Sequence, residues 1–180
     1  MNKQLGKLLV LGGFGLRLFL NGINIIVSLL KIALYNSLLS DLMNFTHLCA
    51  TTMIVAGFAL IFFTEHDLSD LVLAGCFSTG LLSPVLSFMS EKVSFRFHNN
   101  VSALLGLTMM LAFIIWALKL RRKSNPIAAL AVIGSFAVII LAALISDKSY
   151  IRNLIFRTLI FASTAALTFA AFIEFNNDRS

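Results

Sequence analysis

The chain has 180 residues, of which 59% are hydrophobic and only 12% carry a charge. Together with a mean hydropathy of +0.94, this composition excludes a soluble globular protein and leaves no room for a separate water-soluble domain. The formal net charge of +6 lies beside the apolar stretches, so we assign it to the membrane surface. Nucleic acid is excluded as a partner, because no continuous basic surface remains outside the lipid.

Six apolar stretches are long enough for membrane-spanning helices, since a bilayer core needs ~20 apolar residues in a helix. We therefore predict an all-α polytopic bundle that forms one integral membrane domain over residues 1–180. The predicted spans cover approximately residues 8–31, 42–63, 71–89, 101–118, 127–145 and 154–173. Lys3 and Lys7 precede the first apolar run without a small-residue cleavage site after it, which is typical of an uncleaved signal anchor.

The first span carries a narrow polar stripe. From residue 13 onward, polar or small residues recur every three or four positions, which places them on one face of a helix. The stripe consists of Gly13, Arg17, Asn21, Asn24, Ser28, Lys31 and Tyr35. A tilted spanning helix that turns this face toward partners fits the narrow stripe best. In the alternative, the second half of residues 8–34 lies flat at the membrane interface.

Arg17 is the most informative single residue, because an arginine at the centre of a bilayer costs ~3 kcal/mol or more. It follows Lys7 by about 15 Å along a helix, which is near the midplane if Lys7 marks the headgroups. Two interpretations remain open. Arg17, Asn21 and Asn24 could contact an anion, a lipid headgroup or a partner subunit, or the guanidinium could snorkel to the interface. We expect the specific contact.

The third and fourth spans carry further signals. Gly80 and Pro84 predict a break in the third span, because proline removes a helical hydrogen bond. Residues 93–98 alternate apolar and polar side chains, but with no second strand to pair with they predict an extended or interfacial loop. Trp116, close to Lys119, is typical of the aromatic belt at a membrane interface.

The distribution of basic residues predicts that both termini lie in the cytoplasm. Segments on the N-terminal side of the membrane hold slightly more Lys and Arg than those on the other side, and a dense cluster is hard to translocate. We expect the cluster to contact anionic lipid headgroups through Lys119, Arg121, Arg122 and Lys123. The short loops and the uncleaved N-terminus favour a bacterial inner membrane.

Small residues predict close helix packing, because lipid tails offer no hydrophobic drive for helix association. In the last span Ala162, Ala166 and Ala170 recur every four residues, and we expect this row to pack against another helix or protein. In the second span His47 lies on a polar face with Asn44 and Thr51. A haem or metal would need another ligand at the same depth. We therefore expect a hydrogen-bonded structural histidine, and no metal or cofactor.

Three function classes follow from these features. A non-enzymatic subunit or accessory factor of a larger membrane assembly is favoured, because Asp70 and Glu174 lie at span ends and leave Arg17 without a carboxylate in its own chain. Such a protein binds other membrane proteins or itself. The alternative is a small transporter or channel that uses the break at Gly80 and Pro84, although no intramembrane acid is available for ion coupling. A membrane enzyme is disfavoured, because no nucleophile with a base is found.

Overall fold

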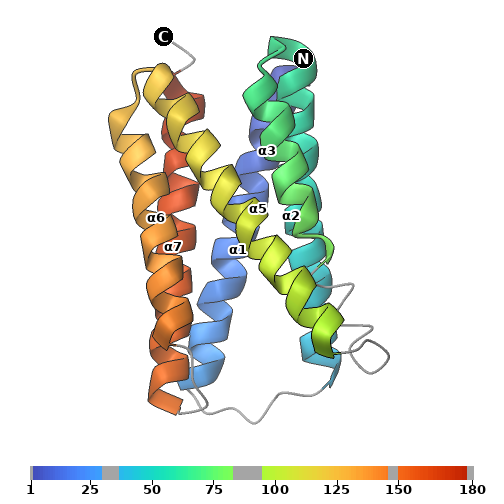
Figure 1. Cartoon of the computed structure of the whole chain (residues 1–180), viewed down its shortest axis with the longest axis vertical. Coiled ribbons are helices and arrows are strands. Elements are labelled where there is room, and N and C mark those ends of the chain that lie inside the picture. Colours follow the sequence, from blue (N-terminus) through green and yellow to red (C-terminus); the bar gives the residue numbers. More distant parts are fainter. Residues whose placement is uncertain (1, 30–36, 83–94, 146–149, 178–180) are drawn as a thin grey trace.

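The computed structural model describes residues 2–29, 37–82, 95–145 and 150–177, and over these ranges the chain is all-α with no strand. The predicted fold class is therefore confirmed. Five of the helices are long and apolar enough to cross a membrane, which makes the chain a multi-pass membrane protein. The helices, labelled in Figure 1, are α1 (Asn2–Leu29), α2 (Ser37–Glu65), α3 (Leu68–Thr79), α5 (Phe95–Arg122), α6 (Pro126–Ile145) and α7 (Tyr150–Asn177).

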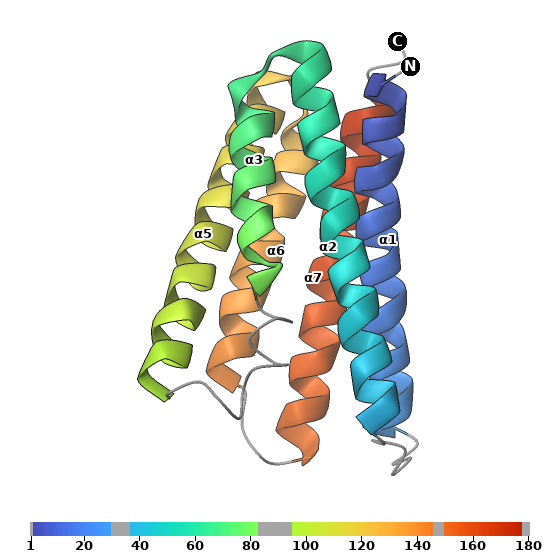
Figure 2. The ribbon, with the colours of Figure 1, turned by 90° about the vertical axis from the view of Figure 1, so that its right-hand side faces the viewer.

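The described helices form a ring. Each helix packs most closely against two neighbours, in the order α1, α2, α3, α5, α6, α7 and back to α1. Figures 1 and 2 show the N- and C-termini at the same end of this ring, together with the connections from α2 to α3 and from α5 to α6. We call it the terminal end. A ring of helices must fill its centre with side chains or leave a cavity, and this bundle does both.

Helix α3 covers only part of the third predicted span. Its 12 residues rise about 18 Å, which is less than the ~30 Å of a bilayer core. The helix ends at Thr79, and the backbone N–H of Gly80 donates to the carbonyl of Phe77 at 3.0 Å. The predicted break at Gly80 therefore coincides with the end of α3, whereas Pro84 lies outside the described residues.

Helix α3 begins at a cap that the sequence signals. The Asp67 side chain accepts a hydrogen bond from the backbone N–H of Ser69 at 2.9 Å, as an N-cap residue should. Burial raises the pKa of the Asp67 carboxyl, but the hydrogen bonds from Ser69 and the positive charges of Lys119 and Arg122 outweigh it and hold the pKa below its usual range. Asp67 is therefore a charged cap at the terminal end.

The extended or interfacial loop predicted over residues 93–98 is wrong for its last four residues. Helix α5 begins at Phe95, so residues 95–98 are helical, while residues 93 and 94 lie outside the described residues. The physical reason is backbone hydrogen bonding. A short alternating segment without a partner strand leaves its N–H and C=O groups unpaired, and a helix that continues into the span pairs them internally.

Glycines bring α1 and α2 into close contact. A Cβ atom placed on Gly13 would lie 2.6 Å from the Ala50 carbonyl oxygen, and one on Gly57 would lie 2.6 Å from the Gly6 carbonyl oxygen. No real Cβ approaches a backbone atom so closely, so only glycine fits at these two positions. Because van der Waals contact between backbones drives helix association in lipid, this seam is a main source of stability for the pair.

The row of alanines predicted to pack in α7 is only partly buried. Ala170 is fully buried and Ala166 is half-buried, but Ala162 is exposed. Residues spaced by four drift by about 40° per step around a helix of 3.6 residues per turn, so a row of three leaves the buried face. Ala166 and Ala170 therefore pack within the chain, whereas Ala162 is exposed, and its expected contact with another protein stays a prediction. The buried face of α7 instead follows Ser163, Leu167, Ala170, Ala171 and Glu174.

Candidate functional site

An aromatic cluster fills the ring on the side of the terminal end. Trp116 is fully buried, and its ring stacks on Phe14 with centroids 5.4 Å apart. Phe58 and Phe77 pack edge-on against the same indole, with centroids 5.8 and 6.5 Å away. The four rings come from α1, α2, α3 and α5. The prediction that Trp116 lies in the aromatic belt at the membrane interface is therefore wrong. Its large indole instead fills the centre of the ring, in contact with three other helices.

A buried ion cluster lies next to these rings. The Lys119 ammonium is 1% exposed and forms an ion pair with Asp70, and its Nζ lies 3.1 Å from Oε1 of Glu174. The indole Nε1 of Trp116 donates to Oε2 of the same Glu174 at 2.8 Å. Nζ of Lys123 lies 3.7 Å from Oε1 of Glu174, so a second positive charge is close to the second carboxylate of the cluster. One lysine of α5 thus joins acids of α3 and α7 across the ring.

This cluster corrects the expected lipid contact of the basic segment. Lys119 is buried and paired, so it does not reach headgroups, whereas Arg121 and Arg122 are exposed at the terminal end. Lys123 is half-buried and also lies 3.6 Å from Glu65. The sequence did contain a signal for this ion cluster. Asp70, Lys119 and Glu174 each flank a predicted span on the same side of the membrane, so opposite charges lie at one membrane depth.

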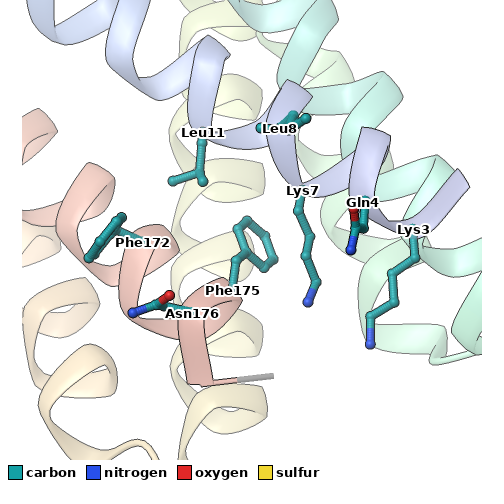
Figure 3. Close-up of a pocket in the computed structure, with 8 residues that line it drawn as sticks. All are labelled: Lys3, Gln4, Lys7, Leu8, Leu11, Phe172, Phe175 and Asn176. Carbon is teal, nitrogen blue, oxygen red and sulfur yellow. The ribbon is translucent and has the colours of Figure 1, made fainter. Parts of the chain in front are cut away.

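A small groove lies between the start of α1 and the end of α7, and Figure 3 shows the residues that line it. Its volume is about 280 Å³. Lys3 at its rim pairs with Glu65 at 2.5 Å, and Nζ of Lys7 lies 5.8 Å from the ring centroid of Phe175, within cation–π range. Because these lysines already have partners, the groove is a weaker candidate site than the cavity described next.

A large cavity occupies the other half of the ring, on the far side of the aromatic cluster. Its volume is about 1110 Å³, and α3 ends at its edge, where Phe77 and Gly80 contribute to the lining. One side is polar and comes from α1, α2 and α7. The polar lining residues are Arg17, Asn21, Asn44, His47, Thr51, Ser163 and Thr164. The polar face predicted on the second span therefore lines this cavity.

The opposite wall of the cavity is apolar. It is built by α5 and α6, which contribute methionine, phenylalanine and isoleucine side chains such as Met109, Phe113, Phe136 and Ile139. No acidic residue is found among the described lining residues. The cavity therefore combines one cationic group, several neutral hydrogen-bonding groups and a broad hydrophobic surface.

Arg17 lies near the middle of α1 and contacts the protein rather than the interface. Its Nη2 donates to the hydroxyl of Thr51 on α2 at 2.6 Å. Its Nε is buried without a hydrogen-bond partner, and no described carboxylate lies within ion-pair distance of the guanidinium. The hydrogen-bonding partner comes from the same chain, so this contact needs no second subunit.

The rest of the polar stripe turns toward α7. The Asn21 side-chain amide donates to the hydroxyl of Thr164 at 2.9 Å. Arg157 donates from Nη1 to the backbone and side-chain oxygens of Asn24, at 3.2 and 3.3 Å. In the sequence Arg157 lies near the start of the last predicted span, where long basic side chains snorkel easily to the interface. Its position three residues into the last predicted span was the only signal for this contact.

No family model, curated protein sequence or solved structure matches this chain. Among the residues that the structure describes, no group of three or more His, Cys, Asp or Glu side chains could hold a metal ion. Function is therefore inferred from the cavity, the residues that line it and the ion cluster that lies beyond it.

Proposed function

We propose that the chain is a small, non-enzymatic membrane carrier that binds an amphipathic solute in the ring cavity. The observation that carries the proposal is the cavity itself, with about 1110 Å³ of space between a polar side and an apolar wall. Ligand sites are typically ~300–1,000 Å³, mostly apolar, with a few polar groups that orient the ligand. The polar side and the apolar wall face one space, so an occupant with both a polar group and an apolar part fits it.

The position of the cavity supports transport in particular. It lies in the half of the ring away from the terminal end, while the aromatic cluster and the ion cluster close the terminal end. A carrier requires such an asymmetry, because a solute must reach its site from one side at a time. Asp70 and Glu174 are 0 and 1% exposed. Both acids pair with Lys119, so they help to close the terminal end, and no acid for ion coupling lies among the described lining residues of the cavity.

The accessory-subunit function is a second proposal with less support. Its main residue was Arg17, which lines the cavity of its own chain and donates to Thr51. Its remaining support is Ala162, a small residue exposed on the outer face of α7 where another helix could pack closely. Contacts of Arg121 and Arg122 with anionic headgroups also stay a proposal, supported by their exposure.

Filling the cavity should weaken binding strongly while leaving the fold intact. Gly106 lines the cavity, and a Cβ there would have nothing within 4 Å, so the Gly106→Phe side chain has room to enter the space. We expect it to weaken the binding of octyl-chain solutes by about tenfold or more. Native mass spectrometry of protein released from phosphatidylcholine nanodiscs measures the bound fraction of octanol and octyl sulfonate.

The matched control is Gly134→Phe on α6. Gly134 also has open space around its Cβ but does not line the cavity, so binding should stay within about twofold of the unmodified protein. Equal binding by the two variants would place the solute outside the ring and contradict the carrier proposal.

We also propose a bacterial inner membrane with cytoplasmic termini, supported by the exposed Arg121 and Arg122 at the terminal end. In a variant with Cys49→Ser and Cys76→Ser, a membrane-impermeant maleimide added to intact cells should label Arg152→Cys. It should label Arg121→Cys only after permeabilisation. Labelling of Arg121→Cys in intact cells would reverse the proposed orientation.

A further inference from the structure

We infer that the solute is an amphipathic anion, with its acidic headgroup on Arg17 and its apolar chain along the wall made by α5 and α6. This inference rests on the proposed carrier function and names the chemical class that the cavity selects. The headgroup is a carboxylate, sulfonate or phosphate, and a hydrocarbon chain is attached to it.

The charge of the cavity is the first argument. Arg17 is the only Lys, Arg, Asp or Glu among the described lining residues, and its guanidinium donates to a neutral acceptor, the hydroxyl of Thr51. A guanidinium has five N–H donors in a fixed fork, so most of its donor capacity is left for a ligand. A charge held in the middle of a spanning helix is costly, and an anion offsets that cost far better than a neutral group does.

The neutral polar groups of the cavity add a second argument. Asn44, His47 and Ser163 lie on the same lining as Arg17, and the Ser163 hydroxyl is buried with no hydrogen-bond partner. Donors of this kind can bind the remaining oxygens of an acidic headgroup. A cationic headgroup would meet Arg17 with like charge and would find no described acid in the cavity.

The apolar wall is the third argument, because it indicates that the anion also carries a hydrocarbon chain. Met109, Phe113 and Ile139 face the cavity from α5 and α6, and methionine adapts its shape to irregular ligands. A small inorganic anion would leave this surface in contact with water. A hydrocarbon chain attached to the headgroup covers it, so burial of the chain and pairing of the charge act on one ligand.

Three solutes with the same tail test the inference: octyl sulfonate, octanol and octyltrimethylammonium. In phosphatidylcholine nanodiscs we expect octyl sulfonate to bind at least about tenfold more tightly than the other two. Arg17→Gln should remove this preference, and Arg17→Lys should keep part of it, because lysine retains the charge without the fork. Without solute, Arg17→Gln should melt no lower than the unmodified protein, since it removes an uncompensated charge.

The other possible results of this experiment show whether the anion inference or the carrier proposal is wrong. If octanol binds as tightly as octyl sulfonate in the unmodified protein, the anion inference fails while the carrier proposal stands, even if Arg17→Gln does not fold. If none of the three binds, the carrier proposal fails as well. Nanodiscs with added phosphatidylglycerol distinguish the source of the anion. A lipid headgroup on Arg17 would be retained in the mass spectrum and displace octyl sulfonate, whereas a free solute would bind equally in both membranes.

Discussion

Replacing Lys119 by methionine should destabilise the protein by about 3–5 kcal/mol, the range found when one partner of a buried ion pair is removed. Lys119 is 1% exposed and joins Asp70 on α3 to Glu174 on α7. Without its ammonium, two carboxylates remain buried in a ring of apolar helices. Thermal unfolding of the purified protein in mild detergent measures the loss.

Two comparisons separate the ion cluster from a general effect of lost charge. Arg121→Gln, on the exposed side of the same helix, should change stability by less than about 0.5 kcal/mol. Combining Lys119→Met with Asp70→Asn and Glu174→Gln removes all three charges and should recover much of the lost stability. If Lys119→Met melts like Arg121→Gln, the buried ion cluster is not formed in the membrane protein.

Replacing Gly13 by leucine should separate α1 from α2 and cost at least about 1–3 kcal/mol, the usual penalty for overpacking. The added Cβ alone would lie 2.6 Å from a backbone oxygen of α2, and backbone cannot yield as a side chain can. Because the seam positions Arg17 one helical turn further along, solute binding should fall too. Melting temperature and octyl sulfonate binding are the two readouts.

Gly15→Leu on the same helix is the matched control, since a Cβ at Gly15 has nothing within 4 Å. Leucine also has a higher helix propensity than glycine by up to about 1 kcal/mol, so Gly15→Leu should be neutral or stabilising. Equal loss of stability in both variants would mean that α1 and α2 are not held together through Gly13.

Some of the site could be predicted because it depends on spacing along one helix. The polar stripe on α1 was visible as a period of three to four residues, and the polar face of α2 was visible in the same way. Which helix each stripe faces was not visible. Arg17 donates to Thr51 on α2, Asn21 donates to Thr164 on α7, and these pairings depend on how the ring closes.

The sequence by itself determined the class of the protein and the position of most helices, because hydropathy is a local property. The predicted spans at 42–63, 127–145 and 154–173 lie inside α2, α6 and α7, and both α2 and α7 extend beyond their apolar stretches into polar residues. Only the tertiary structure decided which polar groups are buried. Lys119, Glu174 and Trp116 look like interfacial residues when each span is considered alone. Closure of the ring brings these three side chains together at its centre. There each is a hydrogen-bond or ion-pair partner of another, which offsets the free-energy cost of burying its polar group.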